Sequence, residues 1–219
     1  MNAVASLKIL LVDDHEVVRR GLAAILEGYE GLEIVGEAAD GWAAVQIAID
    51  KQPDVIVMDV GLPELNGFEA TRHILKLRPA TEVLILTLHD GEQLVREVLA
   101  AGARGYVMKG DAGRHLLEAV RSLSRHEPYF TSEMAARVYA ESQRTPRPGR
   151  PTASGLTQRE REVTQLLAEG KSNREVAERL GLSSRTVETH RANIMRKTGT
   201  GSLAELVIYA AREGIIPGA

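Results

Sequence analysis

Polar residues that could do chemistry stand at the ends of four apolar runs in the first half of the chain. The clearest is Asp59, which follows the run Val55-Ile-Val-Met58 and precedes a loop with Pro63 and Gly67. Taken alone, an acid in such a position most often caps the following turn. The other three runs end in the same way, however, and the residues that follow them are Asp13 and Asp14, Thr87, and Lys109.

These residue types would make a phosphoryl site if the fold brought them together. Three clustered carboxylates repel one another, so they call for a hard cation with oxygen ligands, and Mg²⁺ fits. A Mg²⁺ flanked by an ammonium and a hydroxyl can hold a phosphoryl group. Neither G-x-x-x-x-G-K-[ST] nor G-x-G-x-x-G occurs in the chain, so no nucleotide-binding loop is predicted. We therefore expect a covalently held phosphoryl group, with Asp59 as the nucleophile.

Alternating strands and helices would position these side chains. Five apolar runs predict strands, and apolar residues at helical spacing follow each of them; the runs are 7–12, 34–35, 55–58, 83–86 and 106–108. This alternation predicts an α/β fold with a doubly wound parallel sheet. In the flavodoxin-like strand order 2-1-3-4-5, the first and third strands are neighbours, and ligands bind outside the carboxyl ends of the strands. That order would gather all five polar side chains at one edge of the sheet.

Composition and charge indicate two small domains with different partners. The chain has 219 residues, of which 44% are hydrophobic, and it has no cysteine, which excludes disulfides and suits a reducing compartment. No apolar run approaches the length of a membrane span, and the N-terminus does not resemble a signal peptide. We therefore predict a cytoplasmic protein with no membrane partner. Residues 1–130 hold 13 Lys and Arg against 20 Asp and Glu, a net of −7, whereas 156–219 hold 10 against 8, a net of +2.

Residues 7–125 resemble the receiver domain of response regulators over their whole length. The resemblance implies that Asp14 binds Mg²⁺ directly, that Asp13 binds it through water, and that Asp59 is the phosphoacceptor. It also implies roles for four further residues: the backbone carbonyl of Gly61 as a metal ligand, Thr87 and Lys109 as phosphoryl contacts, and Tyr106 as the aromatic that swings inward with Thr87.

Several neighbouring residues need an interpretation of their own. Gly110 follows Lys109 where many receivers carry proline, so no cis peptide is expected there. Leu88, beside Thr87, is bulkier than the small residue often found at that position. We interpret His15 as surface of the first helical turn, because a carboxylate-bound Mg²⁺ does not use imidazole. The aromatic residues Trp42, Tyr129 and Phe130 are interpreted as packing residues.

A linker is predicted between the two halves. Residues 131–142 have modest helical character, and 143–155 combine three prolines and two glycines with arginines. Such a composition cannot form a core and is typical of an extended tether. We therefore place a first domain at 1–130, a linker at 131–155 and a second domain at 156–219.

The second domain is predicted to be all-α. Three S/T-x-x-E capping boxes begin at Thr157, Ser172 and Ser202, each ahead of an apolar-periodic run, and glycines stand where the helices should stop. This pattern predicts four short helices. The second and third are joined by Leu180-Gly-Leu-Ser183, the short corner of a helix-turn-helix. In the third, 184–198, one side carries Val187 and Ile194, and the opposite side is polar with flanking cations, which suits a major groove.

Residues 156–216 resemble the LuxR-type helix-turn-helix, and the two halves together resemble a NarL/FixJ-type regulator. The resemblance rests on Leu156-Thr-Gln-Arg-Glu-Arg-Glu-Val163, on the run from Ser172 to Leu180 and on Thr186-Val-Glu-Thr-His190. It implies DNA contacts from the outer side of the 184–198 helix, with three positions near base edges and cations on phosphates: Arg185, Glu188, Thr189, Ala192, Arg196 and Lys197. The last helix, with Leu203, Leu206, Val207 and Ala210, is implied as the dimer contact.

The favoured interpretation is a transcriptional regulator, not an enzyme, that takes a phosphoryl group from a histidine kinase and forms a homodimer on promoter DNA when activated. A haloacid-dehalogenase-type phosphatase would need a second Asp two residues after the nucleophile, and Gly61 stands there. A regulator whose first domain binds a ligand or partner and ignores phosphate is the remaining alternative. We also expect the acidic first domain to cover the 184–198 helix until phosphorylation releases it.

Overall fold

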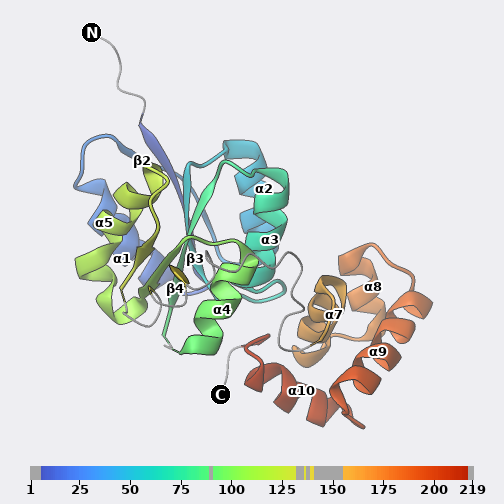
Figure 1. The fold of residues 1–219 in the computed structure, drawn as a ribbon. Helices are drawn as coiled ribbons and strands as arrows, with labels where there is room; N and C mark the ends of the chain where they lie inside the picture. The colour runs from blue at the N-terminus through green and yellow to red at the C-terminus, as the bar shows by residue number, and fades with distance from the viewer. Residues whose placement is uncertain (1–5, 89–90, 132–135, 137–138, 141–154, 217–219) are drawn as a thin grey trace.

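The computed structural model describes the chain except residues 1–5, 89–90, 132–135, 137–138, 141–154 and 217–219 (Figure 1). It contains an α/β domain and a smaller helical domain that lie against each other. The predicted helix and tether of the linker fall almost entirely on residues outside the described part.

A parallel sheet forms the centre of the first domain. Strands β1 (Leu7–Val12), β2 (Leu32–Ala38), β3 (Val55–Asp59), β4 (Glu82–Thr87) and β5 (Gly105–Met108) take the predicted order 2-1-3-4-5. The five residues of β3 are all buried, which explains why its sequence is a continuous apolar run with no alternation.

The prediction of five strands was one strand short. Strand β6 (Tyr129–Phe130) pairs in parallel with β5, and the Tyr129 N–H donates to the carbonyl of Arg104 at 3.1 Å. Two residues are too few for a strand pattern to show in the sequence, so the packing role expected for these aromatics was only part of what they do.

Helices cover both faces of the sheet (Figure 1). Helices α1 (Glu16–Glu27) and α5 (Ala112–Ser124) pack on one face, where Leu22, Leu26 and Leu116 are buried. On the other face lie α2 (Gly41–Lys51), α3 (Gly67–Leu77) and α4 (Glu92–Ala101). A short 3-10 turn, η1 (Lys109–Asp111), joins β5 to α5, and no peptide bond of the described residues is cis, as expected for Lys109–Gly110.

The second domain has the predicted four helices: α7 (Gln158–Ala168), α8 (Asn173–Leu180), α9 (Ser184–Thr198) and α10 (Leu203–Arg212). The capping boxes at Thr157 and Ser172 are complete. At Ser202 the hydroxyl accepts from Glu205 N as expected, but the Glu205 carboxylate accepts from Gly201 N, so the third box is incomplete. Gly181 ends α8 at φ 63°, a left-handed conformation that glycine adopts without steric cost.

The two domains meet through α7 and the chain that follows α10, which contact the β3–α3 loop and α3 (Figure 1). Gln165 of α7 lies at the centre of this contact. Its side-chain oxygen accepts from Asn66 N at 2.7 Å, and its nitrogen donates to the Leu62 carbonyl at 2.9 Å. Trp42 of α2 packs against the apolar cores of both domains.

Candidate functional site

Three of the predicted side chains meet at the carboxyl edge of the sheet. Lys109 Nζ lies 2.9 Å from Asp59 Oδ2 and 2.7 Å from Asp13 Oδ2. The remaining oxygen of Asp59, Oδ1, accepts from the backbone N–H of Val60 at 2.8 Å. Asp13 is completely buried and Asp59 is 6% exposed. The ammonium therefore bridges two buried carboxylates that would otherwise repel each other.

The electrostatics of this cluster follow from burial and pairing. Burial raises the pKa of Asp59 above its usual range; the hydrogen bond and charge of Lys109 act in the opposite direction, and the nearby charge of Asp13 adds to the rise. Burial acts to lower the pKa of Lys109, but its bonds to Asp13 and Asp59 outweigh that effect and raise it. The ammonium form is thus retained between the acids.

Asp14 and His15 continue the cluster toward the surface. His15 stands at the N-cap position of α1 without a side-chain capping bond, and it is exposed, as predicted. Its Nδ1 lies 2.7 Å from Asp14 Oδ1 and 3.3 Å from Asp13 Oδ1. Ligand atoms of Asp13, Asp14 and His15 all lie within 4.8 Å of one another, and Mg²⁺ would use the two carboxylates of this group rather than the imidazole.

The donor set suits a hard cation. Its oxygens come from carboxylates, and Asp13 Oδ2 is buried with no hydrogen-bond partner among the described residues, apart from the ion pair with Lys109. The backbone of Gly61 hydrogen-bonds the Asp59 carboxylate, which places this residue beside the acids. The role of its carbonyl as a metal ligand stays a prediction. Oxygen-rich, negatively charged sites of this kind fit Mg²⁺.

Thr87 and Tyr106 lie on the neighbouring strands. Thr87 ends β4, one residue beyond the position paired with Asp59, and is 4% exposed. Tyr106 of β5 pairs with Ile85 and is completely buried in the core under α3 and α4. The ring of Tyr106 therefore already lies inside in this structure, and its inward swing with Thr87 stays a prediction.

The outer side of α9 is open to solvent. Val187 and Ile194 are buried in the core of the helical domain, and all six predicted DNA-contact residues are exposed on the other sides. Lys197 has a partner on another helix: its Nζ lies 2.6 Å from Oε2 of Glu160, the residue that completes the capping box of α7. Lys197 therefore holds α9 against α7, a role that its sequence position does not reveal.

Family models match both domains. Residues 9–121 match the response regulator receiver domain, and 154–210 match the bacterial regulatory proteins of the luxR family. The chain is 36% identical over 210 residues to the transcriptional regulatory protein LiaR of Bacillus subtilis (strain 168), with 96% of this chain and 99% of LiaR covered. It is 38% identical over 215 residues to the oxygen regulatory protein NreC of Staphylococcus carnosus (strain TM300), with 96% and 99% covered. The chain is a response regulator with a luxR-type output domain.

Solved structures of response regulators share this fold. A LuxR-family response regulator from Aurantimonas sp. SI85-9A1 is 35% identical, with a TM-score of 0.58 over 63% of this chain and 99% of that one. A structure of the RcsB response regulator in complex with DNA is 25% identical, with a TM-score of 0.55 over 94% of this chain and 98% of that one.

One expectation for this response regulator is wrong. The receiver domain does not cover the recognition helix, because α7, rather than α9, lies against it (Figure 1). On α10, Leu206 and Ala210 are completely buried in the core of their own domain, while Leu203 and Ile208 are exposed. A dimer contact through this helix stays a prediction. Within the described residues, no helix is long and apolar enough to cross a membrane.

The interdomain residues were missed by the sequence patterns. Arg161, Glu162 and Gln165 of α7 are at most 8% exposed, although their spacing is typical of a solvated helix face. Glu69 of α3 is 1% exposed for the same reason. No local signal marks these positions, because each becomes buried only when the other domain is present.

Proposed function

We propose that this response regulator is switched by phosphorylation of Asp59 and that its output is transcriptional control through DNA contacts of α9. The phosphoryl donor is a phosphohistidine of a partner kinase. A carboxylate oxygen of Asp59 attacks the phosphorus, and the bond from phosphorus to the donor nitrogen breaks. The chain acts as a regulator and not as an enzyme.

The observation that supports this proposal is the bridged pair of acids. Lys109 and the Val60 N–H each hold one oxygen of Asp59, so its carboxylate is oriented before any donor arrives. Lys109 also reaches Asp13, and it would lie beside the oxygens of a phosphoryl group on Asp59. Thr87 stands on the neighbouring strand at the same edge.

Asp13, Asp14, Asp59 and the Gly61 carbonyl would hold Mg²⁺. When bound, the ion supplies the positive charge that offsets the negative charge of the acids and of the transferred group. Asp13 Oδ1 accepts from the His15 N–H at 2.8 Å, which fixes Asp13 at the turn into α1.

The chemical step is tested with a small acyl phosphate and Mg²⁺, followed by intact-mass measurement. We expect one added phosphoryl group on the wild type and none on Asp59→Asn, because an amide is not a nucleophile here. Asp14→Ala should weaken Mg²⁺ binding. Labelling that persists in Asp59→Asn, or unchanged Mg²⁺ affinity in Asp14→Ala, would remove the proposed roles of these residues.

The DNA step rests on the open outer side of α9, and the solved RcsB–DNA complex provides a family precedent. Arg185 and Arg196 are exposed and are expected to contact phosphates. Replacing either with Ala should weaken binding to all sequences and reduce the salt slope by about one unit. Changes at Glu188 or Thr189 should instead alter base preference. Unchanged preference in both would mean that another face reads the DNA.

A further inference from the structure

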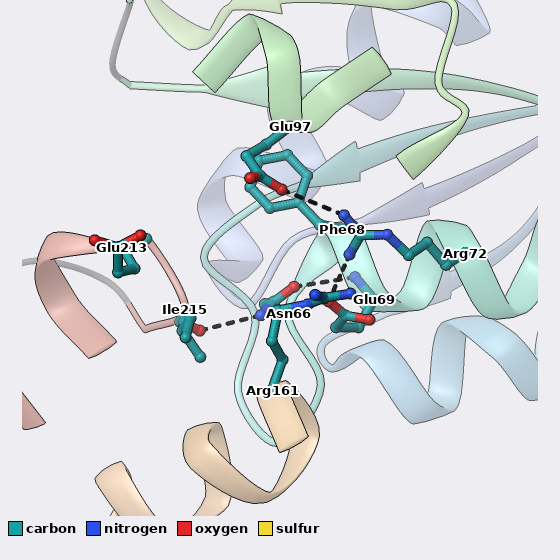
Figure 2. A pocket seen from close by; sticks show the side chains of 9 residues that line it. Asn66, Phe68, Glu69, Arg72, Glu97, Arg161, Glu213 and Ile215 are labelled. Carbon is teal, nitrogen blue, oxygen red and sulfur yellow. Dashed lines mark hydrogen bonds and ion pairs between the residues drawn. The ribbon is translucent and has the colours of Figure 1, made fainter. Parts of the chain in front are cut away.

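Four charged side chains, two of them buried and two half-buried, connect the receiver domain to the luxR-type domain (Figure 2). Arg72 of α3 pairs with Glu97 of α4 at 3.3 Å and with Glu69 of α3 at 2.5 Å. Glu69 also pairs with Arg161 of α7, across the domain boundary. The network therefore runs from α4 through α3 to α7, and its ends belong to different domains.

The four side chains are balanced in charge and poorly solvated. Two carboxylates face two guanidinium groups, and the side-chain exposures run from 1% at Glu69 to 18% at Glu97. Both arginines bind the same oxygen of Glu69, while its Oε2 is buried with no hydrogen-bond partner among the described residues. If one charge is removed from such a set, its partner is left unpaired where little water can solvate it, and this costs a large amount of folding free energy.

Glu97 is the weakest link in this network. The Arg72–Glu97 ion pair is the longest of the three, and Glu97 lies on α4, whereas Arg72 and Glu69 share α3. Arg161, by contrast, also donates to the Leu156 carbonyl at 2.7 Å and is fixed within its domain. Loss of Glu97 would leave one carboxylate between two arginines, so Arg72 and Arg161 would compete for Glu69 and repel each other.

The network borders the other interdomain contacts. Asn66 caps α3 by accepting from Glu69 N at 3.0 Å, and its side-chain nitrogen donates to the Ile215 carbonyl at 3.1 Å. These residues, together with Glu97 and Arg161, line a cavity of about 20 Å³, roughly the space for one water molecule (Figure 2). Glu213, which also lines it, is exposed, so solvent screens its charge.

We propose that Glu97, Arg72, Glu69 and Arg161 form a charge latch through which α4 controls the attachment of the luxR-type domain. The proposal rests on the proposed phosphorylation of Asp59. Helix α4 follows Thr87 in the chain, so a phosphoryl group that draws Thr87 toward Asp59 displaces the start of α4 and withdraws Glu97 from Arg72. The DNA-binding side of α9 is already exposed while the two domains are in contact. Opening the latch therefore lets the luxR-type domain change its orientation; it does not uncover the DNA-binding side.

The latch predicts that a change confined to the receiver domain loosens the domain contact. The N–H groups of Glu64 and Asn66 donate to Glu169 and Gln165 across the boundary, at 2.9 and 2.7 Å. Their hydrogen exchange therefore reports opening of the contact, in proportion to the open population. In the unphosphorylated full chain without DNA, Glu97→Gln should accelerate exchange at both amides by roughly 5- to 150-fold, the usual span of coupling between sites.

Glu92→Gln is the matched control. Glu92 lies on the same helix and pairs with Arg96 at the surface, so its loss should leave exchange at Glu64 and Asn66 unchanged. Arg161→Met should accelerate exchange as Glu97→Gln does. The double variant should be less than additive, because both changes open the same network. Equal behaviour of Glu97→Gln and Glu92→Gln, or full additivity with Arg161→Met, would overturn the latch.

A second measurement separates the latch from the proposed function. Acyl phosphate with Mg²⁺ should accelerate exchange at the two amides in the wild type and add little in Glu97→Gln. Phosphorylated wild type with unchanged exchange would overturn control by α4. If no phosphoryl group is added, the proposed function fails, and the comparison of Glu97→Gln with Glu92→Gln still decides whether the latch holds the domains.

Discussion

Gly67 offers a sharp test of how closely α3 is joined to the phosphorylation site. It is the first residue of α3, and a Cβ added there would lie 2.0 Å from the carbonyl oxygen of Asp59, 2.9 Å from its carbonyl carbon and 3.0 Å from Val60 Cα. All three are backbone atoms, so no side-chain rotation can relieve the overlap. Gly67→Ala therefore forces the end of β3 and the start of α3 apart.

The size of the effect can be estimated from this contact. Ordinary contact with a Cβ begins at 3.4 Å, so the atoms must separate by a further 1.4 Å, the difference between 3.4 and 2.0. Overpacking of this kind costs about 1–3 kcal/mol, and the better helix propensity of alanine returns up to ~1 kcal/mol. A misplacement of ~1 Å can also cost about 100-fold in rate at a reacting group. We expect lower stability together with much slower phosphorylation.

Two other glycines provide controls. Gly41→Ala would place a Cβ 1.9 Å from the carbonyl oxygen of Leu65 rather than from the backbone of Asp59. It should therefore destabilise the receiver domain but slow phosphorylation less than Gly67→Ala does. A Cβ added at Gly113 of α5 would meet no atom within 4 Å, and φ there is not positive, so Gly113→Ala should be neutral or stabilising by up to ~1 kcal/mol. Urea unfolding and the time course of acyl phosphate labelling measure both effects. Wild-type stability and labelling rate in Gly67→Ala would refute the close approach.

Three further predictions concern the luxR-type domain and its contact. Thr157→Ala removes the cap of α7 and should lower the unfolding free energy by about 0.5–2 kcal/mol, measured by urea unfolding with Thr157→Ser as the conservative control. Because Lys197 pairs with Glu160, Lys197→Ala should destabilise the domain more than Arg196→Ala does, and it should weaken DNA binding less. The opposite ranking would mean that Lys197 acts mainly as a DNA contact. Burial acts to raise the pKa of Glu162, but the bonds of its carboxylate to His73 and Arg159 outweigh burial and lower that pKa. The stability that Glu162 adds to the domain contact is therefore fully present above the ordinary pKa of a glutamate. It is lost as the pH falls through the lowered pKa of Glu162. Fluorescence of Trp42, the single tryptophan, reports this loss, and His73→Gln should move it to higher pH.

The receiver site was predictable because each of its residues is placed by its own strand. Asp13, Asp59, Thr87 and Lys109 follow apolar runs, and a parallel sheet brings the ends of such runs to one edge. The domain contact had no such marker. Glu69 and Arg161 are 92 positions apart and separated by the linker, so their pairing depends on how two finished domains meet. Strand β6 was missed for a simpler reason, because two residues are too few to show a period.

The β3–α3 loop belongs to both functions of this response regulator. At one end, the Gly67 N–H donates to the Val60 carbonyl at 3.0 Å, directly after Asp59. Along its length, the backbone groups of Leu62, Glu64 and Asn66 bind side chains in α7 and at its C-cap, namely those of Gln165 and Glu169. These bonds are made by backbone groups of the loop, so they respond to any shift of the loop itself. Because α9 lies on the far side of its domain from this loop, a shift there would change where the recognition helix points and leave its exposure as it is (Figure 1). Regulation in this chain is therefore expected to act through the orientation of α9 rather than through its exposure.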